Sequence, residues 1–219
     1  MKRAVSIEEI SDGKLYGLND LVKAGCNDCK GCCDCCQGMG SSIVLDPLDI
    51  HRLLVHLNCA FEELLENHIE LNIVEGIILP NLKMAGQSER CSFLNTEGRC
   101  SIHPFRPGIC RLFPLGRYYT NQTYQYFLQI KECKKENKTK VKVRNWIDTP
   151  NIKNNEQFVI AWHYFLSDLQ NLIKDAQDEE QIKAMNMYVL KKFYMSPYDL
   201  EEDFYLQFQE RLSKVKEII

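Results

Sequence analysis

The chain has 219 residues, enough to bury one ordinary core or a main domain with a small appendage. Its net charge of −3 argues against a general surface for nucleic acid or anionic membranes, so we expect no nucleic-acid partner. No run approaches 18 apolar residues, and the opening stretch MKRAVSIEEISDGK turns acidic after two basic residues. We therefore expect neither a membrane span nor a signal peptide, and predict a cytoplasmic protein.

Short elements are predicted in the first 130 residues. Asp46 and Pro47 supply an N-cap and a first-turn proline for a helix that runs to about Leu57. The other expected elements here are a strand over 41–45, a helix over 60–69, extended segments within 70–84 and a β-hairpin over 117–130. The hairpin prediction depends on Asn121-Gln122, which has strand-type residues on either side.

From Glu156 onward, apolar residues recur every three to four positions, which predicts three amphipathic helices. The breaks between them fall near Gln177-Asp178 and Ser196-Pro197. The fold class expected is α+β, mainly α, with a cysteine-rich metal-binding unit, a short β-hairpin and C-terminal helices. We expect a cysteine-cluster domain over 1–145 and a helical extension over 146–219 packed on it.

Eleven cysteines are the most unusual feature of the composition, and all of them lie between Cys26 and Cys133. The cytosol keeps thiols reduced, and an odd number leaves one thiol over from any set of disulfides. Such cysteines indicate metal ligation or redox chemistry. The chemistry of this protein is therefore expected in the first two thirds of the chain.

Six of the thiols fall within the eleven residues CNDCKGCCDCC, 26–36. A C-x-x-C pair lets one turn direct two sulfurs at one centre. Cys26, Cys29 and Cys32 make two such turns in succession, a run common to zinc sites and iron-sulfur ferredoxins. Cys32 and Cys33 are adjacent, and because neighbouring side chains diverge, they suggest either two neighbouring metal centres or one multinuclear cluster.

Four distant thiols complete a set of eight, which can fill two tetrahedral all-thiolate sites or bind clusters. The predicted metal ligands are Cys26, Cys29, Cys32, Cys33, Cys91, Cys100, Cys110 and Cys133. Cys59 stands alone in LNCAF and is expected to be a core residue. His103 follows Cys100 by three residues and is an alternative nitrogen donor, although eight thiolates make it unnecessary.

These motifs resemble the CxxCxxCC cysteine-cluster family, the YkgJ-type zinc- or iron-chelating domains, which is defined by eight cysteines. CxxCxxCC corresponds to residues 26–33, and the elements C-x-F-L, C-x-I and R-P-x-x-C-R-x-F-P begin at Cys91, Cys100 and Arg106, with Cys133 as the last cysteine. The resemblance covers roughly residues 20–145. It implies an iron-sulfur or zinc centre. Flagellin lysine N-methylases look like a branch with a similar cysteine set.

The chain departs from the family pattern by two extra thiols, Cys35 and Cys36. They are either further ligands or exposed thiols that exchange or oxidise. Cys36 also completes, with Cys29 and Cys33, the C-x3-C-x2-C spacing of radical S-adenosylmethionine enzymes. Those enzymes need a long βα barrel around the cluster, and the sequence has no repeated strand-helix alternation.

Arg106 and Arg111 lie on either side of Cys110 and are the candidate cofactor-binding residues. Four thiolates on zinc, or on an oxidised four-iron cluster, leave a net charge of about −2, which guanidinium groups can offset while donating hydrogen bonds to sulfur. A role in binding a substrate carboxylate or phosphate is the alternative.

The function predicted from these patterns is metal binding by an eight-cysteine thiolate site, with an iron-sulfur cluster and a redox or protein-modifying role preferred. The alternative is a structural Zn²⁺ module, or a protein that handles zinc or iron without catalysis. The expected partners are the metal ion or cluster and a protein partner or protein substrate. No catalytic residue is assigned.

Overall fold

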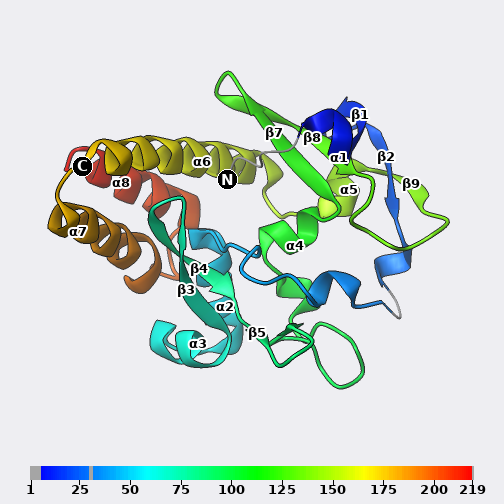
Figure 1. Cartoon of the computed structure of the whole chain (residues 1–219), viewed down its shortest axis with the longest axis horizontal. Coiled ribbons are helices and arrows are strands. Elements are labelled where there is room, and N and C mark those ends of the chain that lie inside the picture. Colours follow the sequence, from blue (N-terminus) through cyan, green and yellow to red (C-terminus); the bar gives the residue numbers. More distant parts are fainter. Residues whose placement is uncertain (1–5, 30–31, 219) are drawn as a thin grey trace. The chain divides into compact units, whose positions relative to one another are not determined.

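The computed structural model describes residues 6–29 and 32–218. Residues 1–5 of the opening stretch, and Lys30 and Gly31 inside CNDCKGCCDCC, lie outside the described residues. The fold is α+β and mainly helical, with short antiparallel hairpins and C-terminal helices, as predicted (Figure 1).

The chain divides into two compact units, and each is built from two separate segments. Unit 1 comprises residues 1–43 and 84–152, and unit 2 comprises residues 44–83 and 153–219. Every cysteine except Cys59 belongs to unit 1. Residues 44–83 thus group with the C-terminal helices, whereas the sequence analysis placed them in the domain expected to end at residue 145.

Unit 1 consists of short strands and helices. Its elements are α1 (Ile7–Ile10), β1 (Ser11–Tyr16), β2 (Leu21–Gly25), β5 (Met84–Ala85), β6 (Arg90–Cys91), α4 (Gly108–Leu112), β7 (Leu115–Thr120), β8 (Thr123–Gln129), β9 (Thr139–Lys142) and α5 (Val143–Ile147), with 3-10 turns at Asn27–Cys29, Asp34–Cys36 and His103–Phe105. Strands β1, β8 and β7 form one antiparallel sheet in that order, and β2 pairs with β9.

The predicted hairpin over 117–130 is confirmed as β7 and β8. Asn121 and Gln122 form the two-residue turn, with left-handed φ angles of 48° and 60° that suit a tight hairpin. Tyr126 and Leu128 of β8 point into a core with Val22, Leu112 and other apolar side chains. This core holds the ends of β2 and α4, between which the cysteine-bearing loops run.

Unit 2 contains the longer helices. Its elements are α2 (Pro47–Leu57), α3 (Phe61–Asn67), β3 (Ile69–Val74), β4 (Ile77–Leu82), α6 (Ile152–Asp175, with its first residue in unit 1), α7 (Glu179–Leu190), a π-helical turn (Lys191–Met195) and α8 (Phe204–Lys216). The α2 prediction is confirmed: the Asp46 side chain accepts from the N–H of Asp49, and the Asp49 side chain accepts in return from the N–H of Asp46.

The strand predicted over 41–45 is wrong. Val44 forms one isolated bridge with Asn81, and the N–H of Leu45 donates to the carbonyl oxygen of Pro80 at 2.9 Å. Helix α2 begins two residues later, so the segment has no room to extend the pairing along β4.

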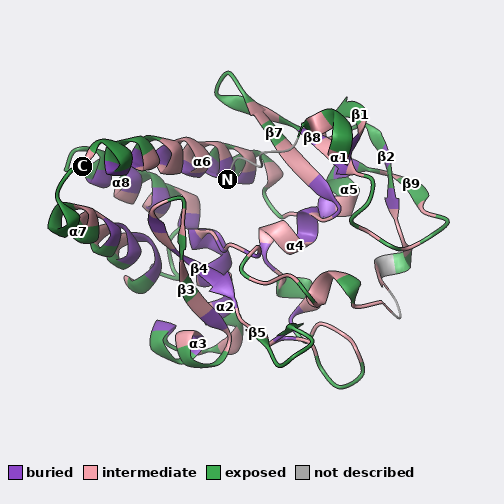
Figure 2. Ribbon diagram, viewed as in Figure 1, coloured by how far each residue is buried: buried purple, intermediate pink, exposed green. Residues whose placement is uncertain are grey.

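Aromatic rings fill the core of unit 2. Trp162 of α6 lies 5.0 Å from Phe193 and 5.4 Å from Phe165, and Phe158 lies 4.6 Å from Phe208 of α8, measured between ring centroids. Buried residues line the inward side of each helix while the outward side is exposed (Figure 2). The apolar residues that recur every three to four positions in the sequence are the residues of this buried stripe.

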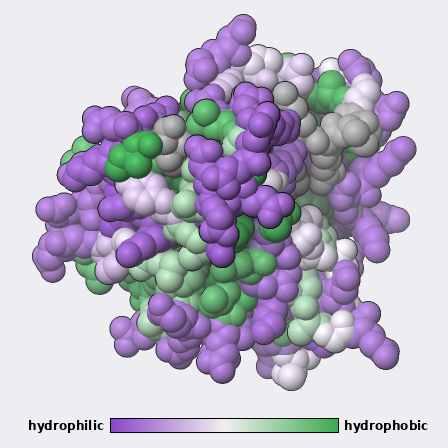
Figure 3. Space-filling view, turned by 60° about the vertical axis from the view of Figure 1, so that its left-hand side comes forward, coloured by the Kyte–Doolittle hydropathy of each residue, from purple (hydrophilic) through white to green (hydrophobic). Residues whose placement is uncertain are grey.

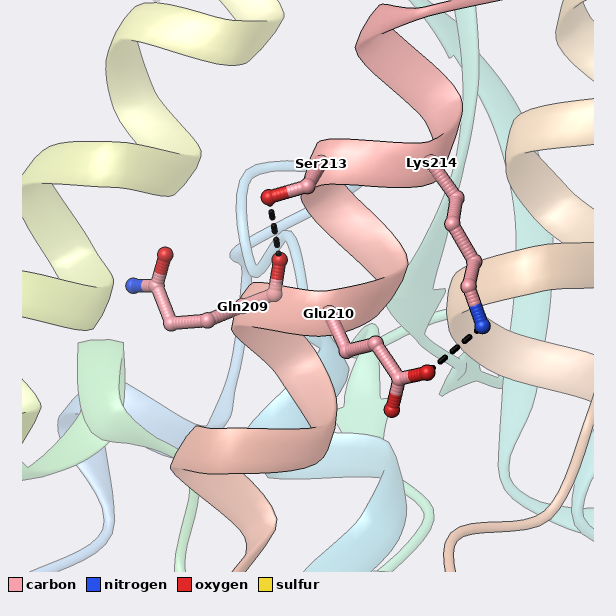
Figure 4. A network of polar contacts seen from close by, with 4 residues as sticks. All are labelled: Gln209, Glu210, Ser213 and Lys214. Carbon is pink, nitrogen blue, oxygen red and sulfur yellow. Dashed lines mark hydrogen bonds and ion pairs between the residues drawn. The ribbon is translucent and has the colours of Figure 1, made fainter.

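The outer face of α8 is polar. Lys214 and Glu210 form an exposed ion pair at 2.6 Å, one helical turn apart, and the Ser213 hydroxyl donates to the carbonyl oxygen of Gln209 (Figure 4). The face drawn in Figure 3 is likewise largely hydrophilic, with smaller apolar areas between the charged side chains. Among residues 6–29 and 32–218, no helix has the length and apolarity needed to cross a bilayer.

Candidate metal centre

A tight turn brings Cys91 and Cys100 close together. Leu94 forms a β-bridge with Cys100, and the N–H of Asn95 donates to the carbonyl oxygen of Arg99 at 2.9 Å. The Asn95 side chain accepts from two backbone N–H groups of the turn, as asparagine commonly does in loops. The C-x8-C spacing is thus the length of one small hairpin whose ends carry thiols.

Contacts on two sides join this hairpin to the cysteine-rich run. Gln37, just beyond the run, forms a β-bridge with Arg90, which precedes Cys91. On the other side, the Arg99 guanidinium donates to the carbonyl oxygen of Cys29 at 3.1 Å. Thiols about 60 residues apart in sequence are therefore held in one region of unit 1.

Cys26 and Cys29 form the first close pair, with their sulfur atoms 3.4 Å apart. Cys29 has a left-handed φ of 53°, an unusual conformation for a residue with a side chain, and such strain tends to occur at functional sites. Two sulfurs on one tetrahedral zinc ion lie about 3.8 Å apart. The C-x-x-C turn therefore places its sulfurs nearly at the separation of two ligands of one metal.

Cys35 and Cys36 form a second pair, joined by a hydrogen bond between their side chains. Cys36 also interacts electrostatically with Cys91 and Cys100, and Cys35 with Cys29. We call the resulting group the interacting thiols. Its members are Cys26, Cys29, Cys35, Cys36, Cys91 and Cys100.

The protonation of these thiols follows from burial and from their mutual contacts. Burial raises the pKa of Cys29 to about 12, and also raises the pKa values of Cys91 and Cys100. The hydrogen bond from Cys36 lowers the pKa of Cys35 to about 7, and the same bond, with burial, raises the pKa of Cys36. Cys29, Cys36, Cys91 and Cys100 are thus neutral at pH 7 without a metal, and a metal must displace their protons to bind them.

Arg106 lies among the interacting thiols, and its positive charge lowers the pKa values of Cys29, Cys35 and Cys100 against the effect of burial. Its Nε atom is buried and has no hydrogen-bond partner within the described part of the chain. A buried N–H donor and a positive charge beside three thiols fit a thiolate-held metal, because the thiolates would supply both the acceptor and the balancing negative charge.

Arg111 contacts backbone carbonyl groups. Its Nε donates to the oxygen of Arg106 at 3.2 Å, its Nη1 to that of Asp148 at 2.9 Å, and its Nη2 to that of Pro104. The side chain is only 8% exposed. Arg111 therefore fastens the loop that carries Arg106 to the end of α5.

His103, the alternative nitrogen donor to a metal in the sequence analysis, already has a hydrogen-bond partner for its Nε2 atom. Nη1 of Arg106 lies 2.8 Å from Nε2 of His103, so this ring nitrogen accepts a hydrogen bond from the guanidinium. His103 thereby orients Arg106, and its Nε2 lone pair is not available to a metal in this arrangement.

Other predicted ligands have different neighbours. The Cys32 thiol is near Asp34 and Lys135, and the Cys33 sulfur accepts from the Gln37 side chain at 2.9 Å. Cys110 lies in α4, and Cys133 lies between β8 and β9. Cys59 belongs to unit 2, follows the end of α2 and is partly buried.

Over the two described ranges, no three His, Cys, Asp or Glu side chains are arranged as a ready metal site. The interacting thiols are gathered but do not yet converge on one point. Cys35 and Cys36 interact with thiols of the distant hairpin although they are outside the predicted eight. The signal for them was a second CxxCxxCC spacing, formed by Cys29, Cys32, Cys35 and Cys36.

The fold and this site define a thiol-rich metal-binding protein. Residues 26–146 match the sequence profile of the CxxCxxCC family, described as "Putative zinc- or iron-chelating domain", over more than half of the chain. The chain belongs to this family, and the resemblance stated above is confirmed. No curated protein and no solved structure matches it.

Proposed function

We propose that unit 1 holds an iron-sulfur cluster through thiolates and has a redox role. The observation that supports this most is the gathering of six thiols from two distant chain segments, the run 26–36 and the hairpin 91–100, with Arg106 and its buried Nε among them. Six thiols exceed the four that one tetrahedral ion needs, which favours a multinuclear centre. A bound cluster would supply one-electron chemistry.

The interacting thiols are the first candidates for ligands. Cys26, Cys29, Cys91 and Cys100 are common to this group and to the eight predicted ligands. The other four of the eight, Cys32, Cys33, Cys110 and Cys133, remain candidates for a second centre. Arg106 would donate to a thiolate and offset negative charge, while Arg111 keeps the Arg106 loop in position.

The experiment is anaerobic purification followed by a visible absorption spectrum and by analysis of iron, zinc and acid-labile sulfide on the same sample. A brown protein with iron and sulfide in similar amounts supports the cluster. A colourless protein with tightly held zinc overturns it. If the protein is brown, reversible bleaching of its colour by dithionite would support the redox role.

A zinc site is the second candidate, favoured by the 3.4 Å separation of the Cys26 and Cys29 sulfurs. It would make unit 1 a structural module or a protein that passes zinc or iron to a partner. Release of the metal to a chelator of moderate strength distinguishes the two, because a structural zinc is held tightly.

A protein-modifying role is proposed only on the resemblance of the cysteine set to that of flagellin lysine N-methylases, and it would require a protein substrate. The free thiols favour a reducing compartment, and we propose the cytoplasm.

A further inference from the structure

An open cavity of about 380 Å³ lies in unit 1 on the Cys26 side of the interacting thiols. It is lined by Gly25, Cys26, Asn27, Lys135, Glu136, Asn137 and Thr139. Cys26, which shares its close pair with Cys29, is the only one of the interacting thiols among these lining residues. A molecule in the cavity would therefore lie against the outer member of that pair.

The walls of the cavity are held by the β2 and β9 pairing. Gly25 at the end of β2 lies opposite Thr139 at the start of β9, and the Thr139 hydroxyl donates to the carbonyl oxygen of Gly25 at 3.4 Å. A β-carbon at Gly25 would lie 2.4 Å from the Thr139 hydroxyl oxygen, so any larger residue here would force the Thr139 side chain to move. The cavity is thus framed by paired strands.

The lining has the chemistry of a site for a zwitterion. Lys135 supplies one positive charge and Glu136 one negative charge, and Asn27, Asn137 and Thr139 add amide and hydroxyl groups. The Lys135 ammonium group also lies close to the Cys32 thiol of the cysteine-rich run. The volume is at the lower end of the range for small-molecule sites and suits an amino acid or a short peptide.

We propose that this cavity binds a small thiol compound that carries both a carboxylate and an ammonium group, and that it brings the sulfur of this compound beside Cys26. Lys135 binds the carboxylate and Glu136 the ammonium group. This inference deepens the proposed function and rests on it, because the cavity would give a small-molecule thiol access to the metal centre.

The test uses the reduced, metal-free chain and four disulfides that differ in charge: cystine (zwitterionic), dithiodiglycolate (anionic), cystamine (cationic) and bis(hydroxyethyl) disulfide (neutral). The Cys26 thiolate attacks one sulfur, a Cys26 mixed disulfide forms, and the other half leaves as a thiolate that takes up a proton. Peptide mass spectrometry measures the rate at Cys26. A Cys29→Ser background prevents the thiol 3.4 Å away from resolving the adduct.

Each rate is divided by the rate with the neutral probe, which removes any general change in Cys26 reactivity. We expect Lys135→Met to lower the relative rates of cystine and dithiodiglycolate about two- to fivefold, the effect of one partly screened ion pair. Glu136→Gln should lower those of cystine and cystamine by a similar factor. Lys140→Met, an exposed lysine on β9 outside the lining, is the matched control.

The proposal is overturned if Lys135→Met changes the relative rates of the charged probes no more than Lys140→Met does. If a variant unfolds, the parent chain still decides the matter: its preference for cystine should fall when NaCl is raised to about 0.5 M, and the lack of any preference overturns the site. Because no metal is present, failure here is distinct from failure of the chain to bind iron or zinc.

Discussion

The two arginines on either side of Cys110 differ in what their guanidinium groups contact. Arg106 lies beside thiols and keeps a buried Nε without a partner in the described structure, whereas Arg111 donates to three backbone carbonyl groups. Sequence analysis treated them as equivalent because it saw only their spacing around Cys110. The distinction comes from tertiary contacts: Arg106 precedes α4 and lies beside thiols, whereas Arg111 lies within α4 and reaches carbonyl groups as distant as that of Asp148.

Replacing Arg106 by Gln should weaken metal binding about ten- to hundredfold, the usual cost of losing a group that supports metal ligands. The free energy of unfolding of the metal-free chain should change by about 1 kcal/mol at most, because Nε has no partner and the hydrogen bond lost is the one from Nη1 to the His103 side chain. Metal competition titrations and urea denaturation measure the two quantities. Arg111→Gln is the control and should mainly lower the stability of the metal-free fold, because three backbone carbonyl groups lose their donor. Unchanged metal affinity in Arg106→Gln would contradict this assignment.

Replacing Cys36 by Ser should remove a thiol that interacts with both Cys91 and Cys100 and should lower the amount of bound metal by half or more. Cys59→Ser is matched in chemistry but lies in unit 2, and it should bind as much metal as the unchanged chain. Elemental analysis of the three purified proteins checks this. Full metal content in Cys36→Ser would exclude Cys36 as an essential ligand.

Local sequence patterns predicted the metal-binding character of the site but did not predict its centre. C-x-x-C at Cys26 and Cys29 predicts two sulfurs near one point, and they lie 3.4 Å apart. That Cys35 and Cys36 interact with Cys91 and Cys100 depends on the contact of Gln37 with Arg90, a pairing of distant segments that spacing does not encode.

At the scale of elements, helices with strong end signals were predicted well. Asp46-Pro47 predicted the start of α2, and the breaks before Asp178 and at Ser196 separate α6, α7 and α8. Strands β1, β2 and β9 were not predicted, because each is short and gains its stability from a partner far away in sequence. The pairing of β1 with β8 joins residues more than 100 positions apart.

One buried amide connects α7 to the hairpin of β3 and β4. Asn186 is 3% exposed; its Oδ1 accepts from the N–H of Ile78 at 2.7 Å, and its Nδ2 donates to the carbonyl oxygen of Gly76 at 3.1 Å. Asn186 thus pairs with one backbone group of β4 and with one of the turn that precedes it.

Asn186→Ala should therefore lower the free energy of unfolding by about 2–4 kcal/mol, because two backbone groups lose their partners in a buried place. Asn186→Asp keeps the acceptor for the N–H of Ile78, so its free energy of unfolding should fall by less. Urea denaturation followed by circular dichroism measures both. A loss below about 0.5 kcal/mol in the alanine variant would mean that water replaces the amide.

At the scale of the whole molecule, the two units differ in what stabilises them. Unit 2 has an aromatic core around Trp162, whereas unit 1 has a small core and the thiol-rich loops. Each unit contains one of the two tryptophans, since Trp146 lies in α5, where its indole N–H donates to the carbonyl oxygen of Phe113.

Removal of the metal should therefore lower the unfolding temperature of unit 1 by several degrees and leave that of unit 2 nearly unchanged. Thermal unfolding is followed by tryptophan fluorescence in Trp162→Phe, which reports unit 1 through Trp146, and in Trp146→Phe, which reports unit 2 through Trp162. Equal shifts in both variants would show that the units unfold together.

The order of segments along the chain also affects how the protein is made. Residues 26–36 leave the ribosome more than 50 residues ahead of Cys91 and Cys100, which at about 5–20 residues per second is a delay of several seconds. During that time the first thiols are present without the hairpin that completes their surroundings. The nascent chain is thus exposed to oxidation or to the wrong metal until residue 100 has been synthesised, and loading of the correct centre belongs after that point.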